Sequence, residues 1–499
     1  MTKTAAETKH SYIYKEADWD FPTLQHAYDT IEDIALNDLG LDVYPNQIEI
    51  ISSEQMLDAY SSNGMPLMYR HWSFGKRFAH DETMYSKGYQ GLAYEIVINS
   101  NPCIAYLMEE NTMTMQALVM AHASFGHNHF FKNNYLFRQW TDADAILNYL
   151  DFAKKYISKC EEEYGLDAVE DVLDSAHAIM DQGVFRYRRR PKMSETEKLD
   201  KIKRRLVHHQ ETFNDLWRTL PESEDGDADD EDGPVNVGDI QLPEENLLYF
   251  IEKASPSLEP WRREILRIVR NIAQYFYPQK QTKVMNEGCA SFVHHYIMHE
   301  MHRRGQITDG ALMEFLHSHT SVVFQPDFDD QRYSGINPYA LGFAMMEDIR
   351  RIATDPTEED REWFPDFAGS GDWRGVLKDA WANYRDESFI LQFLSPRVMR
   401  QFHFFALDDR GDKPHYEVDA IHNERGFRRL REALASMYDL SAHDANIQVV
   451  GADLAGDRTL RLQHIRHKGA PLDTKTKDAV VNHITRLWGH DVELESVDA

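Results

Sequence analysis

Cysteine is scarce in this sequence of 499 residues, which contains only Cys103, Cys160 and Cys289. The three stand far apart along the chain, and none belongs to a Cys-x-x-Cys pair. A disulfide framework or a thiolate zinc cluster needs several closely spaced cysteines. The sequence therefore disfavours both and fits a reducing cytoplasm better.

Basic residues are also fewer than acidic residues. The chain has 54 Lys and Arg residues against 83 Asp and Glu residues, which gives a formal net charge of -29. Binding to a phosphate backbone needs clustered Lys and Arg side chains. Over most of its length the chain is therefore not expected to bind nucleic acid, and high solubility is the simpler consequence of its charge.

Long apolar stretches are missing as well. No uncharged run reaches the ~20 residues that a membrane-spanning helix needs. The first ten residues, MTKTAAETKH, lack the apolar core of a secretory signal peptide. We therefore predict no membrane span and a cytoplasmic location.

Apolar side chains are nevertheless plentiful, at 42% of the sequence, so the chain can bury a large core. Helical spacing of these side chains predicts a mostly α-helical main domain over residues 10–395. Within it, β-branched and aromatic residues flank an Asn-Ser-Asn-Pro turn in 93–107, which predicts a short β-hairpin. The acidic run from Glu222 to Asp232 predicts a charged linker or insert over about 190–240.

The last hundred residues change character. Over 400–499, alternating and helical patterns follow one another in the order ββαββαβ, which contains a βαββαβ unit of the ferredoxin-like type. We expect a separate small α+β domain with a role in binding or assembly, and an α+β fold class for the whole chain.

An apolar helical segment near the middle of the chain carries Glu287 and His294. Residues seven apart lie on one face of an α-helix, two turns from each other, and Ala290 and Ser291 leave space beside them. The pair is ~10 Å apart along the axis. His294 is therefore expected to support a ligand rather than to share an ion with Glu287.

A second apolar segment, 120–129, carries His122 and His127. Residues five apart diverge by ~140° on an ideal α-helix. Both imidazoles can face one ion only if Gly126 breaks the helix.

Together the two segments offer the ligands of a metal site. Zinc is held by three or four His, Cys or carboxylate ligands, and catalytic sites keep one position open for water. We predict His122, His127 and Glu287 as metal ligands, with zinc as the candidate ion. A general base then comes from Glu287, from Glu95 or from a neighbouring acid.

Two further histidines are candidates for an assisting role: His294, and His71 in the aromatic and basic loop over 65–76. Loops of this composition often line sites. A structural alternative exists for the whole set, in which the histidines are core residues hydrogen-bonded to the backbone and Glu287 pairs with an arginine. His295 and His299 have the i, i+4 spacing of a metal pair, but they are expected on a solvated face.

At these residues the sequence resembles the stage V sporulation protein R (SpoVR) family of bacteria, over nearly the whole chain from about residue 10. The resemblance implies a cytosolic protein that acts in spore cortex formation, or in stress and stationary-phase physiology in bacteria that form no spores. It also implies a PrkA-like serine protein kinase and a von Willebrand-type protein as partners. The matching segments are 70–76, 91–102, 120–134, 285–288, 314–320, 333–343 and 389–396.

A weaker similarity is to gluzincin metallopeptidases. The runs HASFG from His122 and NEGCA from Asn286 look like the end of the zinc helix (HExxHxxFG) and the third-ligand helix (NEGxA) of that group. Leu118 and Val119 stand where the first histidine and the catalytic glutamate belong. The similarity therefore implies either a scaffold with rearranged ligands, which recruits His127, or an inactive one.

Two functions of different class remain open. One is a metal-dependent hydrolase of peptide or cell-wall bonds, with the ligands and assisting residues named above. The other is a non-catalytic regulatory or scaffold protein that assembles with a kinase through its C-terminal domain and acidic surface. The sequence leaves open whether the protein is an enzyme.

Overall fold

The computed structural model describes most of the chain. The predicted charged insert over about 190–240 falls outside the described residues. These are 12–61, 68–73, 76, 79–80, 95–186, 242–408, 417–420, 423–440, 444–454, 456–466 and 472–498.

Helices dominate, together with small sheets, and the predicted α+β class is confirmed. In the N-terminal half the helices are α1 (Phe21–Asp33), η1 (Ile34–Asp38), α2 (Ser53–Ser61), α4 (Met113–Val119), η2 (Met120–His127), α5 (Asn128–Asn133), α6 (Tyr135–Trp140), α7 (Ile146–Tyr164), α8 (Leu166–Ala178) and η3 (Met180–Gln182). Further on they are α10 (Leu247–Ala254), α11 (Pro260–Gln281), α12 (Lys283–Arg303), α13 (Asp309–Val322), α14 (Pro338–Thr354), α15 (Glu358–Trp363), α16 (Trp373–Asn383), α17 (Asp386–Phe393), α18 (Pro396–Gln401), α19 (Glu424–Met437) and α21 (Thr474–Trp488).

The N-terminal sheet has the strand order β1-β3-β2. The predicted hairpin is present: β2 (Glu95–Ile98) pairs antiparallel with β3 (Cys103–Met108) across the Asn-Ser-Asn-Pro turn. On its other side β3 pairs parallel with β1 (Asn46–Ile51). Because side chains alternate along a strand, Ile104 faces one hydrophobic core and Ala105 faces the other, so this sheet lies between two cores.

The helix α12 lies at the centre of the first core, between η2 and α14. Its small residues permit close approach on two sides. A Cβ added to Gly126 of η2 would lie 2.5 Å from the Cα of Ala290, and one added to Gly288 would lie 2.6 Å from the backbone of Gly342 in α14. The space expected beside Ala290 is thus filled by the backbone of η2.

The second core joins α7, α8, α10 and α11 to the end of the chain. Strands β6 (Asn446–Ala452), β7 (Leu460–Arg466) and β8 (Val492–Asp498) form a sheet in that order, with β7 and β8 parallel. The sheet and α21 bury their apolar faces in this core, and the ring of Trp488 stacks on Phe250 of α10.

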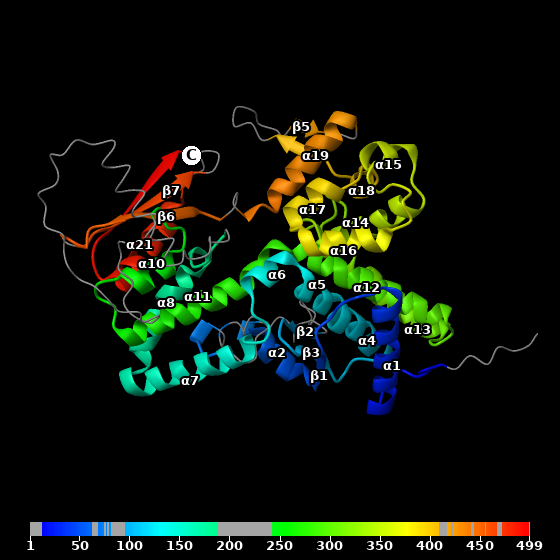
Figure 1. Cartoon of the computed structure of the whole chain (residues 1–499), viewed down its shortest axis with the longest axis horizontal. Coiled ribbons are helices and arrows are strands. Elements are labelled where there is room, and N and C mark those ends of the chain that lie inside the picture. The colour runs from blue at the N-terminus through cyan, green and yellow to red at the C-terminus, as the bar shows by residue number, and fades with distance from the viewer. Residues whose placement is uncertain are drawn as a thin grey trace, which may run out of the picture.

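The C-terminal hundred residues therefore do not form one ferredoxin-like unit. Within the described residues, strands β4 (Ala406–Asp408) and β5 (Glu417–Ala420) pair with each other in a two-stranded sheet, and β5 is not part of the sheet of β6 to β8. The reason is packing: α19, which follows β5, buries Phe427 and Leu430 in the first core. Figure 1 shows α19 and β5 over the helices α14 to α18, while the sheet of β6 and β7 extends to the left of them, over α10 and α21.

Among the described helices, none combines the length and the apolar character that crossing a membrane requires.

Candidate metal centre

Two candidate ligands come from η2, which is a π-helix over Met120–His127. In a π-helix, hydrogen bonds join residues i and i+5, so residues five apart lie one turn apart on the same face. His122 and His127 thus point to the same side, with ring centroids 4.6 Å apart. A break at Gly126 was the expected condition for both imidazoles to face one ion; instead the helix continues and widens, while Gly126 allows η2 to press against Ala290.

The third candidate ligand, Glu287, lies in the first turns of α12. The start of this helix is held by the buried carboxylate of Asp386, which accepts hydrogen bonds from the backbone N–H groups of Val284 and Met285, both at 2.9 Å. Asp386 therefore fixes the position from which Glu287 reaches the histidines.

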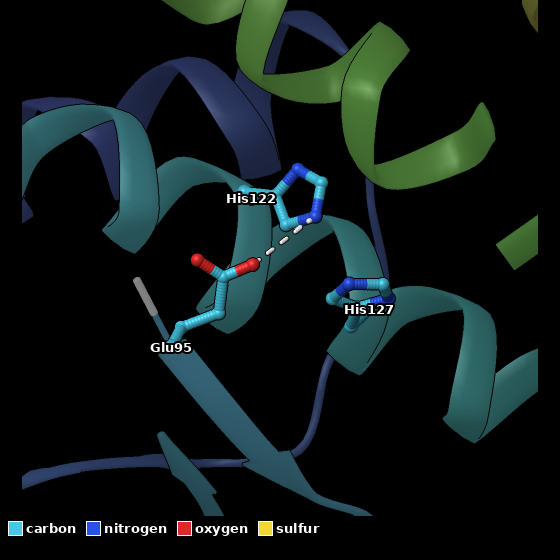
Figure 2. Close-up of side chains that lie close together, drawn as sticks. All are labelled: Glu95, His122 and His127. Carbon is cyan, nitrogen blue, oxygen red and sulfur yellow. Dashed lines mark ion pairs between the residues drawn. The ribbon is translucent and has the colours of Figure 1, made fainter. Parts of the chain in front are cut away.

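The hairpin supplies the fourth group, Glu95, at the start of β2. Figure 2 shows its carboxylate pointing at the two imidazoles of η2. His122 Nε2 lies 3.5 Å from a carboxylate oxygen of Glu95 and 3.9 Å from one of Glu287, while His127 Nε2 lies 3.6 Å from the same Glu287 oxygen. Within the described residues, ligand atoms of Glu95, His122 and His127 also meet the spacing of a metal-binding group.

The atoms that converge in this cluster have few other partners. Within the described residues, His122 Nε2 and Glu287 Oε2 are buried and make no hydrogen bond. The opposite nitrogen of His127, Nδ1, lies 2.9 Å from Asn286 Oδ1, which can only accept, so Nδ1 carries the proton and Nε2 presents a lone pair. A buried polar atom without a partner is costly, which makes such atoms a sign of a missing ligand.

The electrostatics of the site favour a cation. Burial first, and then the neighbouring charge of Glu287, raise the pKa of Glu95 to about 8. Burial, followed by the nearby His127, lowers the pKa of His122 well below its usual value, so its ring is neutral at pH 7. Two carboxyl groups and two imidazoles together offer the oxygen and nitrogen ligands that a divalent ion of the zinc type takes.

The cluster is more open on its acidic side. The side chains of Glu95 and Glu287 keep exposed fractions of 18% and 17%, against 5% for His122. The two glutamate side chains are thus less completely buried than the His122 imidazole.

His294 lies beneath His122 and is not among the converging groups. The two Nδ1 atoms are 2.8 Å apart, and His294 Nε2 lies 2.8 Å from Nδ1 of His319 in α13. This is the supporting position expected for His294. His295 and His299 are half-buried on the next face of α12, with ring centroids 4.3 Å apart.

His71 lies elsewhere, against α8. Its Nδ1 is 2.7 Å from Ser73 Oγ and its Nε2 is 3.1 Å from Asp174 Oδ1. The ring also packs edge-on against His177, at 4.6 Å between centroids. The structure thus brings together Glu95, His122, His127, Glu287 and His294, and it does not bring His71 to them.

The sequence analysis gave no role to three supporting residues, Asn286, His319 and Asp386. Asn286 and His319 both stand inside segments quoted for the family resemblance, so their neighbourhood carried a signal. Asp386 carried none, because it acts on backbone groups about a hundred residues away in the sequence.

Fold and cluster define a largely helical α+β protein with a buried pair of histidines and a pair of glutamates. The profile described as "SpoVR like protein" matches residues 18–443, and the one described as "SpoVR-like C-terminal domain" matches residues 445–499. The chain therefore belongs to the SpoVR family.

A relative supports this membership. The Escherichia coli (strain K12) protein YcgB is 57% identical over 482 residues, which cover 96% of this chain and 92% of the relative. No solved structure matches the chain. The two profiles meet where the chain passes from α19 in the first core to β6 in the second.

Proposed function

We propose that the cluster of Glu95, His122, His127 and Glu287 binds one divalent cation of the zinc type and that the protein is a metal-dependent hydrolase. The observation that carries the proposal is the convergence of these four side chains from three elements, in which His122 Nε2 and Glu287 Oε2 make no hydrogen bond within the described chain.

The spacing fits an ion. Ligand atoms bound to zinc at about 2.0–2.2 Å in a tetrahedron stand about 3.3–3.6 Å from one another. Two of the observed separations, 3.5 and 3.6 Å, lie within this range, and the third, 3.9 Å, exceeds it by about 0.3 Å. These donor atoms are therefore close to the spacing that an ion requires.

The charges fit as well. The two carboxylates repel each other, which contributes to the raised pKa of Glu95, and a divalent cation would neutralise both. An arginine beside Glu287 was the structural alternative, but the ion pairs of Glu287 in the described chain are with His122 and His127.

For the reaction we assign His122, His127 and Glu287 as ligands and Glu95 as the group that takes a proton from the attacking water. A bound zinc ion lowers the pKa of its water towards 7. Glu95 stands 3.5 Å from His122 Nε2 and on the more open side, where it can hold that proton and pass it to a leaving group. The resemblance to gluzincins supports peptide bonds as the substrate class.

Two matched substitutions test this assignment. We expect Glu287→Gln to lose stoichiometric zinc, and Glu95→Gln to keep zinc but to lose cleavage of a mixed peptide pool measured by mass spectrometry. His71→Gln, outside the cluster, should change neither. Loss of zinc in Glu95→Gln would exchange the two roles, and wild-type protein that is folded but binds no zinc would overturn the proposal.

The family suggests where such a reaction is used. We infer a cytosolic role in spore cortex formation, or in stress and stationary-phase physiology, alongside a PrkA-like kinase and a von Willebrand-type protein. Three free, buried cysteines support a reducing compartment.

A regulatory role through assembly is the second candidate, and one observation favours it. In the described chain, β8 is an edge strand whose Glu493 and Glu495 are exposed. Edge strands are common docking sites for partner segments. We expect full-length protein to retain the kinase in a pull-down and Glu493→Lys with Glu495→Lys to release it; an unchanged partner set would count against this candidate.

A further inference from the structure

Two hydrogen bonds between imidazoles join three histidines in a row, one from each of the helices η2, α12 and α13. These histidines are His122, His294 and His319. His122 Nδ1 lies 2.8 Å from His294 Nδ1, and His294 Nε2 lies 2.8 Å from His319 Nδ1. All three rings are at least 96% buried, with exposed fractions of 4%, 2% and 4%. Water therefore does not compete for these nitrogens.

The protons in this row of histidines follow a simple rule. A neutral imidazole carries one N–H and one lone pair. Each of the two hydrogen bonds needs one proton. The protons can therefore all point from His122 towards His319, or all in the opposite direction.

The two carboxylates mark the direction. His122 Nε2 lies 3.5 Å from Glu95 and 3.9 Å from Glu287 and makes no hydrogen bond in the described chain, so it is the nitrogen that a metal ion would meet. A ligand nitrogen presents its lone pair, so the proton of His122 belongs on Nδ1. His294 Nδ1 must then accept, so His294 Nε2 donates to His319 Nδ1.

We propose that His319 is a positioning residue which, by accepting from His294, holds His122 in the Nδ1–H tautomer and so keeps the lone pair of His122 Nε2 directed at Glu95 and Glu287. This role of His319 rests on the metal site of the proposed function. Histidines that bind metals commonly donate their other N–H to a partner, and loss of such a partner typically weakens metal affinity about 10- to 100-fold.

The residues around His319 support a fixed ring. Its ring packs edge-on against Phe343, at 4.7 Å between centroids, and stacks with Phe315 at 5.6 Å. His295 lies 4.9 Å from it, on α12. These contacts hold Nδ1 towards His294.

The first test needs no substitution and no metal. In long-range 1H–15N spectra of metal-free protein labelled at histidine, we expect His122 as the Nδ1–H form and His294 and His319 as Nε2–H forms. Assignment uses single substitutions of each ring. An Nε2–H form of His122 in the wild type would overturn the proposal, even if zinc binds.

The second test removes the acceptor. His319→Phe leaves the Nε2–H of His294 without a partner, so a mixture of His122 tautomers should appear and zinc affinity, from chelator competition, should fall about 10- to 100-fold. His319→Gln offers an amide oxygen as the acceptor and should restore both the single His122 tautomer and the zinc affinity. His317→Gln, an exposed histidine on the same helix, is the matched control and should change neither.

The outcomes separate this inference from the proposed function. If zinc never binds but the three tautomers are as assigned, the metal site falls and the tautomer chain stands. If zinc binds and His319→Phe alters neither the His122 tautomer nor the affinity, the role of His319 is wrong.

Discussion

Two clusters in this protein combine histidines with carboxylates, and they differ in what their polar atoms face. Around His122 and Glu287, donor atoms converge at 3.5–3.9 Å and two of them make no hydrogen bond in the described chain. Around His71 the contacts are complete: both ring nitrogens have partners at 2.7 and 3.1 Å, and Tyr69 OH lies 2.5 Å from His177 Nε2.

The comparison shows why residue types alone do not define a site. In the sequence, His71 was expected to assist the same site as His122 and Glu287, and its cluster with His177 and Asp174 was not predicted. Only the first leaves buried donor atoms aimed at a common point, which is costly unless a ligand compensates. The second satisfies its own hydrogen bonds and therefore has the character of a structural cluster.

The largest expected effect comes from removing an imidazole from the first cluster. His122→Gln or His127→Gln should reduce zinc affinity about 100-fold or more, since each is predicted to bind the ion directly. His71→Gln and His177→Gln should leave it unchanged. Chelator competition with purified protein measures all four, and an equal loss in both clusters would erase the distinction between them.

A smaller effect is expected from the contact that brings η2 to α12. Gly126→Ala places a methyl group 2.5 Å from the Cα of Ala290, where the backbone must move, so we expect a loss of about 1–3 kcal/mol in the free energy of unfolding. Zinc affinity should fall with it, because His127 moves relative to Glu287. Urea denaturation measures the first and chelator competition the second.

Gly310→Ala is the matched control on α13. Its added Cβ would meet only the Thr308 hydroxyl oxygen at 3.7 Å, an ordinary contact. Stability should stay equal or rise by up to about 1 kcal/mol, because alanine reduces the freedom of the unfolded chain. If both glycine variants behave alike, the close approach of η2 and α12 is not what holds the first cluster.

A comparable effect, dependent on pH, is expected at the start of α12. Burial raises the pKa of Asp386 to about 7, above its usual value, so the folded state holds this proton where the unfolded chain has lost it. The contribution of Asp386 to the free energy of unfolding is therefore complete at low pH and is lost as the pH rises through 7. Between pH 5 and 8 this amounts to about 2 kcal/mol for one group.

Asp386→Asn tests that sign. The asparagine does not titrate, so the stability difference between wild type and variant should become less favourable to the wild type as pH rises from 5 to 8. Denaturation midpoints at four or five pH values give the slope. A difference that is constant, or that grows in favour of the wild type, would contradict the buried state of Asp386.

The smallest effect is expected in the second cluster. His71→Phe removes two hydrogen bonds, but Asp174 is partly exposed and keeps the indole N–H of Trp72 at 2.7 Å, so we expect a loss of about 1 kcal/mol in unfolding free energy. A loss as large as that of Gly126→Ala would give His71 a larger structural role than its contacts indicate.

Much of the fold followed from local patterns. The β2–β3 hairpin came from β-branched residues around a turn, and α14 begins at a local signal, with Asn337 as its N-cap and Pro338 in its first turn. These features depend on neighbours in sequence. The split of the C-terminal strands between two sheets did not follow, because it depends on α19 finding the first core, a long-range contact that periodicity does not encode.

The site was predictable to the same degree. Histidines and glutamates in apolar helices pointed to Glu287, His122 and His127, and the structure places them together. The geometry of η2 was missed because a π-helix has no simple sequence signal, and ideal α-helical spacing sets its two histidines apart. The partners Asp386 and His319 depend on tertiary packing alone.

The most direct test of the metal centre is anomalous scattering at the zinc edge from crystals grown with one equivalent of zinc. We expect one dominant peak about 2.0–2.2 Å from Nε2 of both His122 and His127 and from a carboxylate oxygen of Glu287. No peak at this point, or a dominant peak at His71 or at surface histidines, would contradict it.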